Sequence, residues 1–306
     1  MVGLSNAKKK KTSLYADLSL LLVAMIWGGG FIAMKDTLDI LTPFYMNALR
    51  FSIASITLAI IFWKRTIKIT KKDLKYGFVV GIFLWIAFIT QTIGLQYTTV
   101  SKSAFLTGTN VVIVPFLVWI ITKKHPDWYA LIGAFLCALG IGLLTLQESL
   151  SIGIGDSLTL ACAVFFAAHI TSVGYFAEGM DPINLATIQM GATAILSIIG
   201  AVILEPVPKF SGNAVDLMIS LSYMTFVSTM GAFLIQNVAQ KYTVSTHAAI
   251  ILSLESVFGT IFGVIFMSDI LNERMIIGCI LIFCAIIIAE TKLSFLFSQK
   301  KTKEAS

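Results

Sequence analysis

The sequence predicts an all-α integral membrane protein in which ten transmembrane helices form two inverted five-helix repeats. Three observations lead to this fold class. Of the 306 residues, 57% are hydrophobic and only 12% are charged, whereas soluble proteins carry about 25% charged residues. Apolar runs of membrane-spanning length follow one another along the chain. Polar residues of the first half also return at fixed distances in the second half.

Ten apolar runs are expected to be the membrane spans, because a helix needs about 20 apolar residues to cross a bilayer. Only helices and closed barrels satisfy their backbone hydrogen bonds in lipid, and these runs lack the alternation of barrel strands. The runs cover residues 18–34, 44–63, 76–95, 104–121, 128–146, 158–176, 183–204, 214–238, 247–267 and 275–289. The first run follows a lysine-rich tail but lacks a signal-peptide cleavage site, so it is expected to remain as a helix.

Pairs of similar residues mark an internal repeat. They recur at an offset of 139 residues early in each half and of 145 residues later in it. The pairs are Asp17 and Asp156, Pro43 and Pro182, Gln91 and Gln236, Tyr97 and Tyr242, and Asn110 and Glu255. Each copy holds five spans, and because five is odd, the second copy must enter the membrane from the opposite side. Inverted repeats are typical of alternating-access transporters with a site at the midplane.

The repeats and the charges predict the domain organisation and the orientation. The expected parts are a basic tail (1–15), the first repeat (16–146), a linker (147–155), the second repeat (156–291) and a second tail (292–306). With the amino terminus inside, 17 of the 22 lysines and arginines fall on inside segments. Both termini are therefore expected in the cytoplasm and the protein in the plasma membrane. The net charge of +6 does not indicate nucleic acid, because the basic residues flank apolar runs instead of forming one face.

Several short motifs, taken in order, carry a family resemblance over nearly the whole chain. They are Trp27-Gly28 with Phe31, Pro43 with Arg50, Gly155-Asp156, Leu254-Glu255, and Asp269 with Gly278. This ordered set resembles the EamA-type transporters of the drug/metabolite transporter superfamily. Ser256 and Val111 stand where that family has proline. The resemblance implies transport of small organic metabolites, often amino acids and often outward.

Glu255 and Asn110 are the leading candidates for the transport pathway. Each lies nine residues into its apolar run, which is roughly 13 Å deep in a core about 30 Å thick. An ionisable side chain at that depth is costly and by default marks a functional site. An unpaired Glu255 could exchange a proton, while a Glu255 paired with Arg50 could act as a fixed counter-charge to a substrate ammonium. The alternative for both residues is a structural hydrogen bond between spans.

Five further residues are candidates for the pathway, each with a structural alternative. Arg50 could bind a substrate carboxylate, or it could orient the fold or extend toward the interface. His169 could titrate near neutral pH, or be a packed, hydrogen-bonded residue. Gln91 and Gln236 could line the cavity or cap helices. Trp27, like Phe31, Trp85 and Phe166, could face a substrate ring or pack against helices and lipid.

Three glycines at 28–30 permit either a hinge in the first span or close approach of a neighbouring helix. The four cysteines lack metal-ligand spacing and are expected to be packing residues.

Since the chain has neither a phosphate-binding loop nor a His-Glu-x-x-His motif, no catalytic residue, metal or cofactor is expected, and the chain is predicted not to be an enzyme. An integral membrane enzyme and a non-transporting scaffold are the alternatives. Small-molecule substrate and lipid bilayer are the expected partners, with protons as one candidate coupling ion; the substrate, its direction and the oligomeric state stay open.

Overall fold

The computed structural model describes residues 2–123, 125, 128–145, 152–176, 179–208, 214–243, 248 and 251–291. Within these ranges the chain is all-helical and contains no strand, as predicted. The elements are α1 (Val2–Leu38), α2 (Pro43–Ile61), α3 (Trp63–Thr66), α4 (Lys71–Leu95), α5 (Val100–Gly108), α6 (Asn110–Thr122), α7 (Trp128–Thr145), α8 (Ile154–Phe176), α9 (Pro182–Leu204), α10 (Ala214–Ser222), the π-helix η2 (Tyr223–Gly231), α11 (Ala232–Ala239), α13 (Glu255–Met267) and α14 (Glu273–Thr291). Most of the predicted linker and the second tail lie outside the described residues.

Seven helical segments are long and apolar enough to cross a membrane. They are Leu14–Leu38, Pro43–Ile61, Lys71–Leu95, Val100–Thr122, Ile154–Phe176, Pro182–Leu204 and Ala214–Ala239. The predicted runs at 128–146 and 247–267 contain the shorter apolar helices Leu131–Leu143 and Ile251–Met267, and α14 covers the last run. Seven of the ten predicted spans are therefore supported by length and composition.

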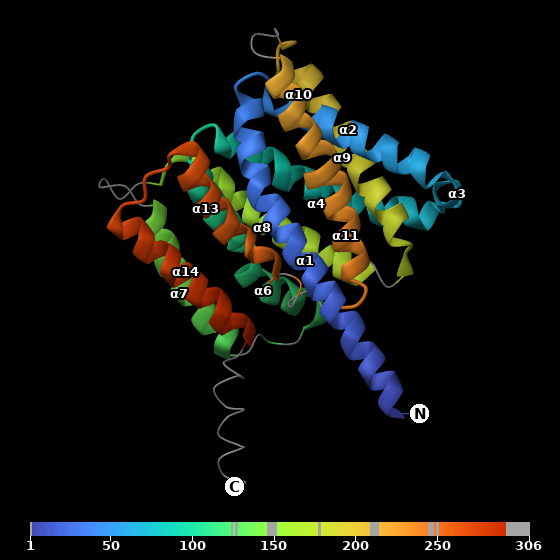
Figure 1. The fold of residues 1–306 in the computed structure, drawn as a ribbon, viewed down its shortest axis with the longest axis horizontal. Helices are drawn as coiled ribbons and strands as arrows, with labels where there is room; N and C mark the ends of the chain where they lie inside the picture. Colours follow the sequence, from blue (N-terminus) through green and yellow to red (C-terminus); the bar gives the residue numbers. More distant parts are fainter. Residues whose placement is uncertain are drawn as a thin grey trace.

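Helices of the first half of the chain pack against helices of the second half (Figure 1). The α7–α14 pair forms one side of the molecule, α2 packs against α9, and α4 packs against both α8 and α9. Helix α1 crosses the centre obliquely and contacts α13 and α11. The large buried side chains at this junction, among them Phe51, Phe88 and Phe233, form the main hydrophobic core.

Several helix ends are fixed by side chains that satisfy the free backbone groups of the first turn. The carboxylate of Glu205, from the end of α9, accepts hydrogen bonds from the backbone N–H groups of Phe44 and Tyr45 at the start of α2. Thr70 and Asp73 form a capping box at the start of α4. The sequence therefore sets where these helices begin, and Glu205 also ties α9 to α2.

Two helices are interrupted at equivalent positions. Thr109 separates α5 from α6, and Leu254 directly precedes α13; the two residues stand 145 positions apart. The helices that follow end at Lys123 and Ser268, again 145 apart, which are the two described non-glycine residues with positive φ, 60° and 55°. Position 256 is not proline, so the interruption at Leu254 occurs without the residue that most often breaks a helix, whereas Pro115 lies inside α6 and removes the backbone hydrogen bond to residue 111.

The glycines at 28–30 allow close packing and do not break the helix. Helix α1 runs through them without interruption. A β-carbon on Gly28 would lie 2.5 Å from the Cβ of Phe258, and one on Gly29 would lie 2.8 Å from the hydroxyl of Tyr223. Of the two readings of this run, close approach of neighbouring helices matches the structure.

Candidate functional site

One cavity between the helices of both halves is lined by all seven residues predicted for the pathway. They are Trp27 from α1, Arg50 from α2, Gln91 from α4, Asn110 from α6, His169 from α8, Gln236 from α11 and Glu255 from α13. The empty space between these residues, counted together with open solvent, is about 520 Å³, but only about 30 Å³ of it can hold the centre of a water molecule. That space suits about two waters, so a metabolite would fit only after side chains or helices move apart.

Glu255 is the acidic residue of this cavity. It is the first residue of α13 and its side chain is buried, with 6% of the residue exposed. Within the described ranges no hydrogen bond or ion pair joins its carboxyl group to another side chain, and none joins it to Arg50. Asn110, at the equivalent start of α6, has a side-chain oxygen without a partner among the described residues. The arrangement matches the alternative in which Glu255 is unpaired.

Arg50 is buried in the lining, with 1% of the residue exposed. Its Nε and Nη2 donate hydrogen bonds to Oγ1 of Thr229, at 3.0 and 2.7 Å. Its Cζ lies 4.6 Å from the centroid of the Phe88 ring and 5.0 Å from that of Phe51, a geometry that favours a cation. Nη1 has no partner in the described part of the chain. Arg50 therefore points into the protein, which contradicts the reading that it extends to the interface.

Three further polar residues of the lining carry an imidazole or an amide. Nε2 of His169 and Oε1 of Gln189 are 2.8 Å apart, so His169 is a buried, hydrogen-bonded residue that also lines the cavity. Gln91 donates to Oγ1 of Thr107 at 3.1 Å. Both side-chain polar atoms of Gln236 lack a partner among described residues. Neither glutamine caps a helix, and both line the cavity, so the first of their two interpretations matches the structure.

The π-helix η2 shapes the side of the cavity that faces α1. Trp27 donates from Nε1 to the backbone oxygen of Ser228 at 2.9 Å, and its ring centroid lies 5.1 Å from that of Phe233. A β-carbon on Gly30 would lie 2.8 Å from Oγ of Ser228, so the glycine makes room for η2. A π-helix bonds each N–H five residues back and is often found at functional sites. Here it presents the Ser228 carbonyl to Trp27 and the Thr229 hydroxyl to Arg50.

Some residues that line the cavity were not predicted from the sequence. Phe88, Phe233 and Ser228 line the cavity, but aromatic and serine residues in apolar runs carry no distinguishing signal. Gln189 does not line the cavity but bonds to His169, and it could have been found because it stands 139 residues after Arg50. Trp85, considered as an aromatic candidate, packs instead beside Phe44 and Ile89, away from the cavity.

The cavity combines one carboxyl group, one guanidinium and several amides with aromatic walls. Such a set can hold a small molecule that has charged groups and an apolar part. Among the residues that the structure describes, no three His, Cys, Asp or Glu side chains are grouped to hold a metal. The cysteines at 137, 162, 279 and 284 are free thiols.

Comparisons with known proteins agree with the membrane architecture. The sequence profile of the EamA-like transporter family matches residues 14–146 and again 153–291. An uncharacterized transporter of Archaeoglobus fulgidus is 37% identical in sequence, and the alignment covers 91% of this chain and 87% of the relative. The uncharacterized transporter YoaV of Bacillus subtilis is 22% identical, and the alignment covers 93% of this chain and 98% of the relative. A crystal structure with 17% sequence identity aligns with a TM-score of 0.69 over 92% of this chain and 98% of that one, which shows likeness of fold. The chain belongs to the EamA-like transporter family and is a multi-pass membrane protein.

Proposed function

We propose that this protein is a secondary transporter that exports small organic metabolites, amino acids or related compounds, across the plasma membrane. The observation that carries the proposal is the cavity that both Glu255 and Arg50 line; among the described residues Glu255 has no ion-pair partner and Nη1 of Arg50 has no hydrogen-bond partner. Membership of a transporter family supports movement of a small molecule. Intramembrane charges that line a cavity are typical of substrate and ion pathways.

The proposed architecture is ten spans in two inverted repeats, with α8, α9, α10–α11, α13 and α14 as counterparts of α1, α2, α4, α5–α6 and α7. Helix packing supports this assignment. Helices α2 and α7 each pack on their own counterpart. Helix α4 packs on α8, and the counterpart pair α11 and α1 is also packed. Likewise α1 packs on α13, and its counterpart α8 packs on α5 and α6. Exchange of the two halves thus preserves the pattern of contacts.

Both termini are proposed to lie in the cytoplasm. The excess of basic residues on the predicted inside segments supports this orientation. The start of α1 and the end of α14 lie toward the same side of the molecule (Figure 1), as an even number of crossings requires.

Two groups of the cavity are proposed to recognise the two ends of an amino acid. The free Nη1 of Arg50 can donate to a substrate carboxylate, for which a guanidinium is well suited. Glu255 can accept a hydrogen bond from a substrate ammonium, or it can take a proton in exchange. The aromatic side chains of Phe88, Phe166 and Phe233 provide a surface for an apolar substituent.

Transport is proposed to proceed by alternating access around this cavity. The space of about 30 Å³ in the present conformation is too small for an amino acid, so the cavity has to widen before an amino acid can bind. Binding would favour wider conformations only to the extent that the substrate contacts them better.

The test is export of labelled amino acids from proteoliposomes with and without a pH gradient. Glu255→Gln keeps the shape of the side chain and removes its charge. If Glu255 is the proton carrier, the variant loses the pH dependence of export but still exchanges substrate across the membrane. The matched control is Glu273→Gln, which removes an exposed carboxylate at the start of α14 and should leave transport unchanged. If Glu255→Gln transports like the wild type under both conditions, Glu255 is structural and the proposed site is wrong.

A further inference from the structure

A groove on the surface of the protein runs between α4 and α9. Lys75, Phe78 and Val79 of α4 form one wall, and Gly191, Ala192 and Ile195 of α9 form the other. It offers about 540 Å³ to the centres of water molecules, against about 30 Å³ in the central cavity. A β-carbon on Gly191 would lie 3.1 Å from the hydroxyl of Ser55, so this side of Gly191 faces α2.

The open end of this groove is basic. Lys71 precedes Lys75 by one helical turn, so both lie on the face of α4 that continues into the groove through Phe78 and Val79. Both lysines are exposed, and neither has an ion-pair partner in the described part of the molecule. The nearby carboxylate of Asp73 is occupied by the cap of α4, where it accepts from the backbone and hydroxyl of Thr70.

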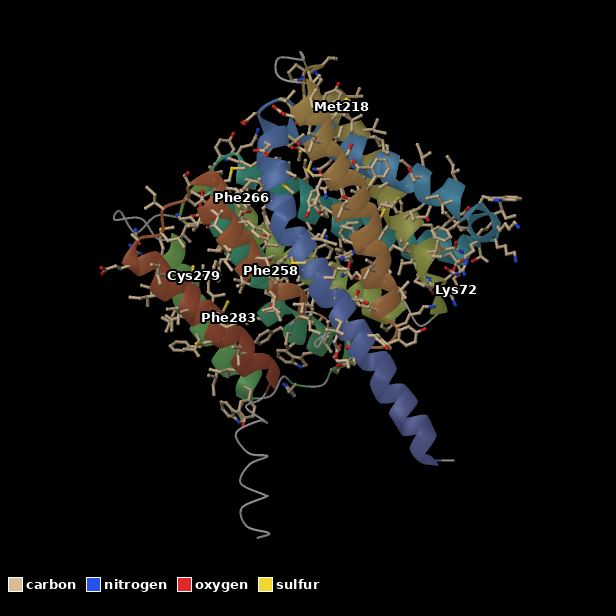
Figure 2. All side chains as sticks on the ribbon, in the orientation of Figure 1. Lys72, Met218, Phe258, Phe266, Cys279 and Phe283 are labelled. Carbon is tan, nitrogen blue, oxygen red and sulfur yellow. The ribbon has the colours of Figure 1, made fainter. Side chains whose placement is uncertain are left out.

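The same end of the molecule has the features of a membrane interface. Trp63 and Ile67, in and directly after α3, are 55% and 69% exposed. Amphipathic tryptophan rings collect at the level of lipid headgroups. Lys72 lies toward the edge of the molecule that includes α3 (Figure 2). Six basic residues fall between positions 64 and 75, and juxtamembrane clusters of this size attract anionic lipids.

We propose that the groove between α4 and α9 binds one anionic phospholipid of the adjacent leaflet. Its acyl chain would occupy the apolar groove, and its phosphate would lie between the ammonium groups of Lys71 and Lys75. The charges favour a lipid over a second copy of the chain, because a second copy packed here through the same face would bring its own lysines against these. The site is separate from the central cavity and does not depend on the transport proposal.

The test is native mass spectrometry of the full-length protein equilibrated with equal amounts of phosphatidylglycerol and phosphatidylcholine. The wild type should retain phosphatidylglycerol in preference to phosphatidylcholine. The variant Lys71→Gln/Lys75→Gln should lose about 25-fold in phosphatidylglycerol affinity, because each basic residue at an anionic surface contributes about fivefold. The matched control Lys64→Gln/Lys68→Gln removes the same charge from the same segment and should change the affinity by less than about threefold.

Glycerol phosphate, which has the headgroup charge without an acyl chain, should not be retained. The proposal is overturned if both lysine pairs weaken binding equally, which would indicate diffuse attraction to the basic segment. It is also overturned if Lys71→Gln/Lys75→Gln binds like the wild type, or if glycerol phosphate binds as well as the lipid.

Discussion

Replacing Gly28 by alanine tests whether close packing of α1 on α13 holds the cavity together. The added β-carbon would lie 2.5 Å from Cβ of Phe258 and 2.9 Å from the backbone nitrogen of Gly259. Neither atom is the end of a flexible side chain, so α1 and α13 must separate by about 1 Å to reach ordinary contact distance. Overpacking of this kind costs about 1–3 kcal/mol.

Gly30→Ala is the matched control on the same helix. Its β-carbon would meet the hydroxyl of Ser228 at 2.8 Å, and a hydroxyl can rotate away. Both substitutions gain about 1 kcal/mol in helix propensity, so this term cancels in the comparison. Gly28→Ala should therefore be about 1–3 kcal/mol less stable than Gly30→Ala.

Thermal unfolding in detergent, followed with a thiol-reactive fluorescent probe, measures this difference. The cysteines at 137, 162 and 279 are buried, so they react when the protein unfolds. Equal unfolding temperatures for Gly28→Ala and Gly30→Ala would refute the reasoning, because they would show that α1 and α13 do not make backbone contact at Gly28.

Two further predictions concern the support of Arg50 and the membrane topology. Thr229→Val removes the acceptor of both Arg50 hydrogen bonds and should lower the free energy of unfolding by about 2–3 kcal/mol. The control Thr225→Val removes a buried hydroxyl without a partner among described residues, and it should leave the free energy of unfolding nearly unchanged in the same assay. Single cysteines at Lys72 and Glu273, in a cysteine-free background, should react with an impermeant thiol reagent from opposite sides of the membrane; labelling of both from one side would contradict the ten-span proposal.

The sequence predicted the helical class and the membrane because composition and run length follow directly from the solvent. Its repeat also indicated pairs of residues that line the same cavity. Gln91 with Gln236, and Asn110 with Glu255, accordingly line one cavity. The roles of these residues in transport remain predictions.

Other features depended on contacts that a single chain does not reveal. The π-helix at 223–231 is formed where η2 packs on the glycines of α1, and its own residues carry no signal for it. For Arg50 the sequence left open a substrate carboxylate, Glu255 or a role in orienting the fold, and it did not point to Thr229, which accepts its hydrogen bonds in the structure. The glycines at 28–30 were compatible with both a hinge and close packing, and only the position of Phe258 and its neighbours decides between them.

The two halves of the cavity are not chemically equivalent. Arg50 has Gln189 as its counterpart at 139 residues, and Glu255 has Asn110 at 145 residues. If the halves were identical, opening toward either side of the membrane would cost the same free energy by symmetry. In the proposed alternating-access cycle, each charged member is confined to one copy, so the outward-open and inward-open conformations differ in energy. In that proposed cycle, the different residues of the two copies would give the unloaded protein a preferred resting orientation.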